Sequence, residues 1–191
     1  LPEQLVLGSG RPTLLLPPTC DPARAQGRCI AVGWNATPEA ARAVWDAMPL
    51  LTAAEEVWGL VVDQDRHDAD FKDTRGEDLA RHLARYGAKV GVKLFRAPSG
   101  DVSGVLREAL NELSADLLVL GAYGHPRMSE LLFGGVTQWA LREAHIPTLL
   151  SRCRRNDPIV STGDKRDLAA ARALPRPERR WSAGNQSPRG S

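Results

Sequence analysis

The sequence predicts an α/β fold with a five-stranded parallel sheet and helices on both faces. Short apolar runs alternate with amphipathic stretches between residues 28 and 152, which is the strand–helix–strand order of parallel sheets. Residues 117–120, Leu-Leu-Val-Leu, are wholly apolar, as expected for a central strand buried on both faces. The length of 191 residues allows one such domain together with additional segments.

The first strand is expected at residues 29–34, followed by a turn into a helix. Thr37 fits the N-cap position, and Pro38 fits the first helical position, where proline loses no hydrogen bond. Apolar residues three and four apart predict the buried face of this helix: Ala41, Val44, Trp45 and Met48. A second strand is expected at residues 57–62.

The remaining elements continue the alternation. A helix is expected at residues 77–87, and the alternating residues 90–95 are typical of an edge strand with one solvated face. Residues 102–113 form the clearest amphipathic helix of the chain. After the buried strand, a last helix is expected at 135–144 and a last strand at 147–150.

A short internal repeat suggests how the chain is organised. Residues 11–17, Arg-Pro-Thr-Leu-Leu-Leu-Pro, resemble residues 146–152, Ile-Pro-Thr-Leu-Leu-Ser-Arg, and each follows a stretch that could end a helix. We therefore expect 11–17 to pair with 147–151. The expected organisation is a remnant of a preceding domain's last strand at 1–18, a linker at 19–27, a domain at 28–152 and a disordered basic tail at 153–191.

Charge and composition exclude several classes of function. The net charge of +2 combines ten basic and four acidic residues after residue 151 with 15 basic and 19 acidic residues before it. The domain is therefore mildly acidic, and nucleic-acid binding is not expected. No apolar run has the ~20 residues of a membrane helix. Three widely spaced cysteines fit neither a disulfide framework nor a metal site, so a cytoplasmic protein is expected.

Ligands of parallel sheets bind at the carboxyl ends of the strands, near the point where strand order reverses. The loops after Trp34 and after Leu120 are the ones to consider. Gly121 and Gly124 allow the backbone to approach a ligand closely, and Gly134 with Gly135 opens a helix whose free N–H groups can hold a phosphate.

Two side chains in the second of these loops add positive charge. His125 and Arg127 flank the glycines and could contact phosphates, although a loop histidine bonded to backbone is an equal alternative for His125. No metal site is predicted, because the acidic stretch that starts at Asp63 lacks the calcium-loop glycine at its sixth position, which is Asp68.

These motifs resemble those of a known family. The spacing of Gly121, Gly124 and Gly134 after the fourth predicted strand resembles the nucleotide-binding signature of the universal stress protein family. Residues 33–37, Gly-Trp-Asn-Ala-Thr, look like the turn after that family's first strand, and 134–137, Gly-Gly-Val-Thr, look like its bacterial members. The resemblance covers about residues 28–152, and residues 1–18 resemble the end of a preceding copy, as in tandem-type members.

The resemblance implies a binding site for ATP or AMP on a Rossmann-like fold of the adenine-nucleotide alpha hydrolase type. Asn35, next to Ala36, stands where members often carry an Asp near adenine and ribose, and Val61 stands where a strand backbone meets adenine. The ribose and phosphates would lie among these residues: Gly121, Gly124, Gly134, Gly135, Val136 and Thr137. This chain departs from the pattern by having neutral Asn35, and Gly135 where Ser or Thr is usual.

The function that follows is a cytoplasmic stress-response regulator, which acts by binding rather than by a committed reaction. The resemblance also implies a homodimer, or pairing with another stress-protein domain through the last strand. Two alternatives stay open: slow ATP hydrolysis at the same glycines, and a dimerisation module that binds no nucleotide. The sequence has no GxxxxGK phosphate loop and no recognisable nucleophile with its base, so it does not predict an enzyme.

Overall fold

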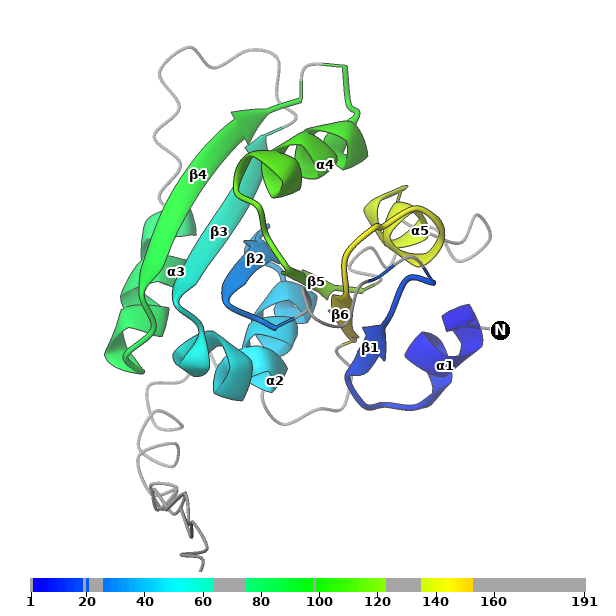
Figure 1. Ribbon diagram of the computed structural model, residues 1–191, viewed down its shortest axis with the longest axis horizontal. Helices are drawn as coiled ribbons and strands as arrows, with labels where there is room; N and C mark the ends of the chain where they lie inside the picture. Colours follow the sequence, from blue (N-terminus) through cyan, green and yellow to red (C-terminus); the bar gives the residue numbers. More distant parts are fainter. Residues whose placement is uncertain are drawn as a thin grey trace, which may run out of the picture. The chain divides into compact units, whose positions relative to one another are not determined.

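The computed structural model describes residues 2–18, 20, 26–63, 75–97, 99–122 and 135–152 of the chain. Figure 1 labels the elements in chain order. The helices are α1 (Pro2–Gly8), α2 (Pro38–Ala53), α3 (Arg75–Arg85), α4 (Val102–Glu112) and α5 (Gly135–Arg142). The strands are β1 (Thr13–Leu15), β2 (Cys29–Gly33), β3 (Glu56–Asp63), β4 (Val90–Arg96), β5 (Leu117–Gly121) and β6 (Thr148–Ser151).

These strands form one sheet in the order β1-β6-β5-β2-β3-β4. The five strands from β2 to β6 are parallel to their neighbours, as predicted. The described sheet has a sixth strand beyond the five expected, because β1 pairs with β6 in the antiparallel direction. The predicted pairing of 11–17 with 147–151 is thus confirmed, over Thr13–Leu15 and residues 148–150.

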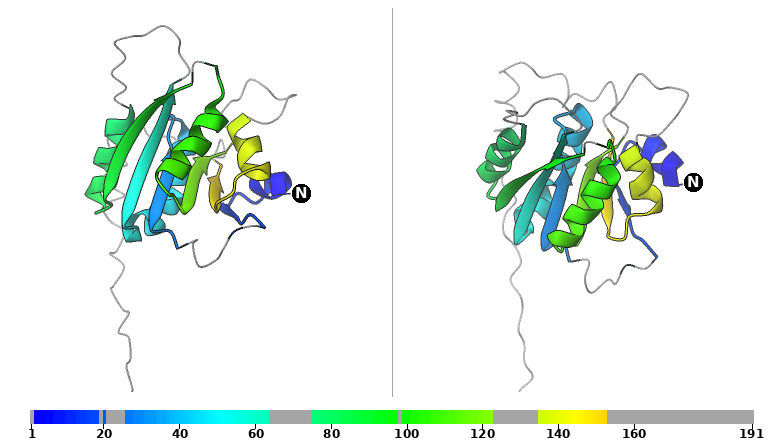
Figure 2. Two further views of the ribbon diagram at one scale, coloured as in Figure 1. Left: turned by 45° about the horizontal axis from the view of Figure 1, so that its top comes forward. Right: turned by 90° about the horizontal axis from the view of Figure 1, so that it is seen from above.

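Helices cover both faces of the sheet (Figure 2). On one face α2 and α3 enclose an apolar cluster with Ile30, Val57 and Val119. On the other face α1, α4 and α5 enclose a second cluster with Leu60 and Leu118. β5 contributes to both clusters and is buried from Leu117 to Leu120, which confirms its predicted place in the middle of the sheet.

The buried face of α2 differs from the predicted one. The buried residues are Ala40, Ala43, Val44, Ala47 and Leu51, whereas Ala41 is exposed and Trp45 and Met48 are only partly buried. Small side chains line the inner face because the helix lies close to the sheet, where its first turn contacts the end of β5. Trp45 and Met48 therefore lie at the border of the contact, whereas Leu51 is buried near the end of the helix.

The observed bounds of the helices and strands agree with the predicted bounds to within about two residues, which is the usual uncertainty of such boundaries. β4 is the edge strand opposite β1, with an exposed Leu94. Residues 153–191 and most of the expected linker 19–27 lie outside the described residues. In the part of the chain that the structure describes, no helix is both long and apolar enough to cross a membrane.

Candidate functional site

The carboxyl ends of β3, β2 and β5 meet where the strand order reverses around β2. The last register pairs join Gly33 to Leu60 on one side and to Leu120 on the other. β2 is thus the shortest of the three at this edge, and its neighbours extend beyond it. We call the space beyond Gly33, between the ends of β3 and β5, the notch. The loops after Trp34 and after Leu120 leave the sheet at this same edge, as predicted.

Hydrogen-bond directions show which backbone groups face the notch. On β3, the carbonyl of Leu60 accepts from Trp34 N (2.8 Å), whereas the carbonyl of Asp63 accepts from Ala97 N beside β4 (2.8 Å). Since successive residues of a strand point their N–H and C=O groups to opposite sides, Val62 directs them toward β2 and Val61 directs them toward β4. The backbone beside the notch is therefore that of Val62, one residue beyond the one that the resemblance implied.

The same reasoning applies to β5. Leu118 N donates to Pro147 O (2.9 Å) and Ala122 N donates to Ser151 O (2.7 Å), so both residues face β6. Gly121 is an odd number of residues from both, so it directs its backbone groups to the opposite side, toward β2 and the notch. Gly121 thus lies where the glycine motif predicts, with no side chain to fill the space.

The turn after β2 is held by side chains within the turn itself. Asn35 Oδ1 accepts from Thr37 Oγ1 (2.8 Å) and from Thr37 N (3.3 Å), and Thr37 Oγ1 accepts from Ala40 N (3.3 Å) as the predicted N-cap. Ala36 between them has a φ of 55°, in the left-handed region. Because Asn35 uses its carbonyl oxygen inside the turn, its exposed amide N–H₂ group is what it offers a ligand.

Gly121 also brings α2 onto the edge of the sheet. A Cβ atom built there would lie 2.5 Å from Ala40 N and 2.5 Å from the carbonyl carbon of Glu39. Glycine is therefore required for this close approach, whatever its part in binding. It fixes the amino end of α2, where the helix dipole is positive, beside the notch.

Glu39 is a residue of this edge that sequence reasoning missed. Its Oε2 atom is buried and has no hydrogen-bond partner among the described residues. Buried carboxylate oxygens normally accept hydrogen bonds, so this acceptor is available to a donor group. No pattern in the sequence separates Glu39 from an ordinary first-turn acid of a helix.

The predicted phosphate side of the site is only partly described. Gly124, His125, Arg127 and Gly134 lie outside the described residues. α5 begins at exposed Gly135, where no heavy atom lies within 4 Å of a built Cβ. Val136 packs partly against the second apolar cluster, and Thr137 is buried with 5% of its surface exposed.

A groove of about 340 Å³ adjoins the start of α5. It runs between α4 and α5, and its lining includes Arg107 and Arg142 with Gly135 at one end. Arg142 approaches Glu3 at 3.9 Å, while Glu143 and Asp101 supply the negative charge of the lining. The two signs balance, so the groove has no net preference for an anion.

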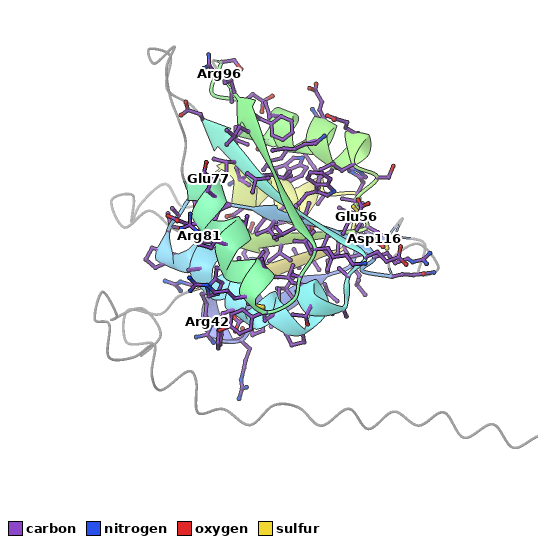
Figure 3. All side chains as sticks on the ribbon, turned by 90° about the vertical axis from the view of Figure 1, so that its left-hand side faces the viewer. Arg42, Glu56, Glu77, Arg81, Arg96 and Asp116 are labelled. Carbon is purple, nitrogen blue, oxygen red and sulfur yellow. The ribbon has the colours of Figure 1, made fainter. Side chains whose placement is uncertain are left out.

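Titratable groups with shifted pKa values lie away from this edge. Burial raises the pKa of the Cys29 thiol, with help from the negative charges of Glu56 and Asp116 at the edge where the strands begin. Figure 3 shows those two acids together, far from Arg96 at the end of β4. A thiol with a raised pKa is a poor nucleophile. Among the described residues, no group of His, Cys, Asp and Glu is arranged to hold a metal ion.

Comparisons with solved structures agree with this architecture. A universal stress protein from Archaeoglobus fulgidus superposes with a TM-score of 0.63 and 15% identity, over 81% of this chain and 54% of that one. The universal stress protein UspA of Lactobacillus plantarum gives 0.52 and 18% identity, over 67% of this chain and 98% of that one. A family member from Arabidopsis thaliana with AMP bound gives 0.50 and 16% identity, over 67% and 93%.

No curated protein sequence matches the chain significantly. The model of the universal stress protein family, in contrast, matches residues 32–152, which is more than half of the chain and contains β3, β4, β5, β6 and the end of β2. The chain is therefore a member of the universal stress protein family.

Proposed function

We propose that this stress protein binds an adenine nucleotide, ATP or AMP, in the notch at the carboxyl ends of β2, β3 and β5. The observation that carries the proposal is the convergence of the backbone groups of Val62 and Gly121 on the space beyond Gly33. Ligands of open parallel sheets bind at such switch points. The bound AMP in the Arabidopsis thaliana family member supports the choice of ligand.

The residues divide into two groups around a nucleotide placed there. Val62, the amide of Asn35 and the free Oε2 of Glu39 suit the nucleoside, which offers both donors and acceptors. The amides at the start of α5, from Gly135 onward, suit the phosphates. Gly124, His125, Arg127 and Gly134 stay predictions for the phosphate side.

Asn35 offers the sharpest test on the nucleoside side. Asn35→Asp keeps the oxygen that accepts from Thr37 and replaces the outward amide by a second acceptor. The ribose hydroxyls of adenosine can accept from the amide or donate to the carboxylate, and adenosine has no phosphates to repel the new charge. We expect adenosine to bind the variant about threefold to tenfold more tightly, because a hydrogen bond to a charged group is stronger than one to a neutral amide.

The assay is competition of adenosine, AMP and ATP against a fluorescent ATP analogue. The matched control is Asn111→Asp, which makes the same change of charge on α4 and leaves affinity unaltered. Absence of saturable binding at millimolar nucleotide contradicts the proposal.

We further propose that residues 1–18 are the last helix and strand of a preceding domain and that stress-protein domains pair through β6. The antiparallel β1–β6 ladder supports this, because it joins the two copies of the Pro-Thr-Leu-Leu repeat. This chain covers 54% of the Archaeoglobus fulgidus chain, and the rest of that chain is long enough for another domain. Extending the protein with a domain of this fold before residue 1 should raise its unfolding midpoint in urea, whereas an unrelated soluble domain should not.

The proposal includes a cytoplasmic location. Among the described residues, Cys29 forms no disulfide, as is usual in proteins of reducing compartments. Cell fractionation with an antibody against the protein tests this directly, and recovery in an extracytoplasmic fraction contradicts it.

A further inference from the structure

The groove between α4 and α5 has the size of a small-molecule site, and its walls are held in place. The two helices lie side by side on one face of the sheet (Figure 2), and the volume of about 340 Å³ is within the range of ligand pockets. Asp101 Oδ1 caps α4 by accepting from Gly104 N (2.9 Å). Near the other end of α4, Asn111 Oδ1 lies 3.1 Å from Nε2 of His145 in the loop after α5. These contacts fix the two walls of the groove relative to each other.

The bottom of the groove holds a hydrogen-bond donor that lacks an acceptor. Trp139 lines the groove, and only 5% of its surface is exposed because its ring also packs into the second apolar cluster. Its Nε1 atom is buried and has no hydrogen-bond partner in the described part of the chain. Buried N–H groups are normally paired. The side chains of the apolar cluster supply no oxygen, so the groove is the side from which a ligand oxygen can reach this N–H.

Opposite charges on the two helices line the same groove without pairing. Arg107 on α4 and Glu143 at the end of α5 form no ion pair with any of the described residues. Arg142 approaches Glu3 at 3.9 Å, and Asp101 is engaged in the cap of α4, so Arg107 and Glu143 are the charges available to a ligand. An anion would be attracted by the first and repelled by the second, whereas a zwitterion would be attracted by both.

The spacing along α5 sets how far apart the two charges of such a ligand lie. Glu143 N donates to Trp139 O (2.7 Å), so the two residues are one helical turn apart on the same face, with about 5–6 Å between their Cβ atoms. A carboxylate at Trp139 and an ammonium group at Glu143 would therefore be close together, as they are on the α-carbon of an amino acid. The groove is also lined by Ser103 and Gln138, whose hydroxyl and amide suit a polar side chain.

We infer that this groove binds a free α-amino acid with a polar side chain. The carboxylate of the ligand accepts from Trp139 Nε1 and from Arg107, and its ammonium group donates to Glu143. This site goes beyond the proposed nucleotide site in the notch and does not rest on it.

The test is an NMR titration of the full ¹⁵N-labelled chain with L-glutamine, followed at the assigned indole N–H signal of Trp139. We expect a saturable shift of this signal at millimolar glutamine, because the N–H gains an acceptor. Two analogues separate the charges of the ligand: N-acetylglutamine lacks the ammonium group, and glutaminamide lacks the carboxylate. Each should bind about tenfold more weakly than glutamine, since each loses a hydrogen bond to a charged group.

Variants of exposed side chains test the same contacts from the protein. Arg107→Gln and Glu143→Gln should each weaken glutamine binding about tenfold. The matched control is Glu108→Gln, which neutralises an exposed acid on α4 outside the lining of the groove and should leave the affinity unchanged.

Several results would overturn the inference. One is the absence of a saturable shift of the Trp139 signal at millimolar glutamine. Another is equal binding of glutamine and either analogue, and a third is an unchanged affinity of Arg107→Gln or Glu143→Gln. L-Leucine that binds as tightly as glutamine would overturn the preference for a polar side chain.

Discussion

Gly121 lies at the point where the sheet, α2 and the candidate site meet, so its replacement by alanine tests the geometry of all three. The added Cβ would be 2.5 Å from Ala40 N, 2.5 Å from the carbonyl carbon of Glu39 and 2.8 Å from its oxygen. All three are backbone atoms in the first turn of α2, so no side chain can rotate to relieve the contact.

The size of the effect follows from these distances. Carbon atoms in ordinary contact are about 3.5–4.0 Å apart, so α2 or the end of β5 must move by about 1 Å. Overpacking of this kind costs about 1–3 kcal/mol, and we expect the upper end because the neighbours are backbone. With a urea m-value of about 2 kcal/mol/M, the unfolding midpoint should fall by about 1.5 M.

Urea unfolding followed by tryptophan fluorescence measures this shift. The control is Gly135→Ala, where no heavy atom lies within 4 Å of the new Cβ. Alanine is favoured over glycine in a helix by about 0.5–1 kcal/mol, so this variant should be unchanged or slightly more stable. A Gly121→Ala protein within about 0.5 kcal/mol of the unaltered chain would refute the close contact between α2 and β5.

Three other changes give expected results by the same assay. Ala36 has a left-handed backbone, which costs alanine roughly 1–2 kcal/mol, and Ala36→Gly removes that cost. Glycine has extra entropy in the unfolded chain, which opposes this gain by about 0.5–1 kcal/mol, so the unfolding midpoint should rise slightly. A lower midpoint contradicts the turn geometry. Asp116→Ala leaves two backbone N–H groups at the start of β2 without their acceptor and should cost about 1–3 kcal/mol, whereas an unchanged midpoint argues against that contact. Burial and, less strongly, Arg85 lower the pKa of His82 below 6.5. The unfolded chain therefore binds the proton first, and the free energy of unfolding falls as the pH drops below 6.5. His82→Gln should lose less stability than the unaltered chain between about pH 7 and pH 5, and an equal loss rules this cause out.

The sequence predicted the features that depend on neighbouring residues. Apolar runs marked the strands, Thr37 with Pro38 marked the start of α2, and the Pro-Thr-Leu-Leu repeat predicted the β1–β6 pairing. Each of these follows from local sequence or from a direct comparison of two segments, which are visible without coordinates.

Features that depend on contacts between distant segments were not predictable in this way. Alanines at 40, 41, 43 and 47 fit either side of α2, and the packing of the helix on the sheet decides which of them are buried. The direction of the Val61 and Val62 backbone depends on the register with β2 and β4. The unpaired oxygen of Glu39 arises from tertiary burial, for which no sequence pattern exists.

The central claim is that a nucleotide binds in the notch beyond Gly33, between β3 and β5. Backbone amide NMR spectra of the isotope-labelled chain, recorded while AMP is added, test it most directly. The account predicts saturable shifts for Asn35, Ala36, Val62 and Gly121, with little change along β4. Shifts confined to the groove between α4 and α5, or no shifts at millimolar AMP, would contradict it.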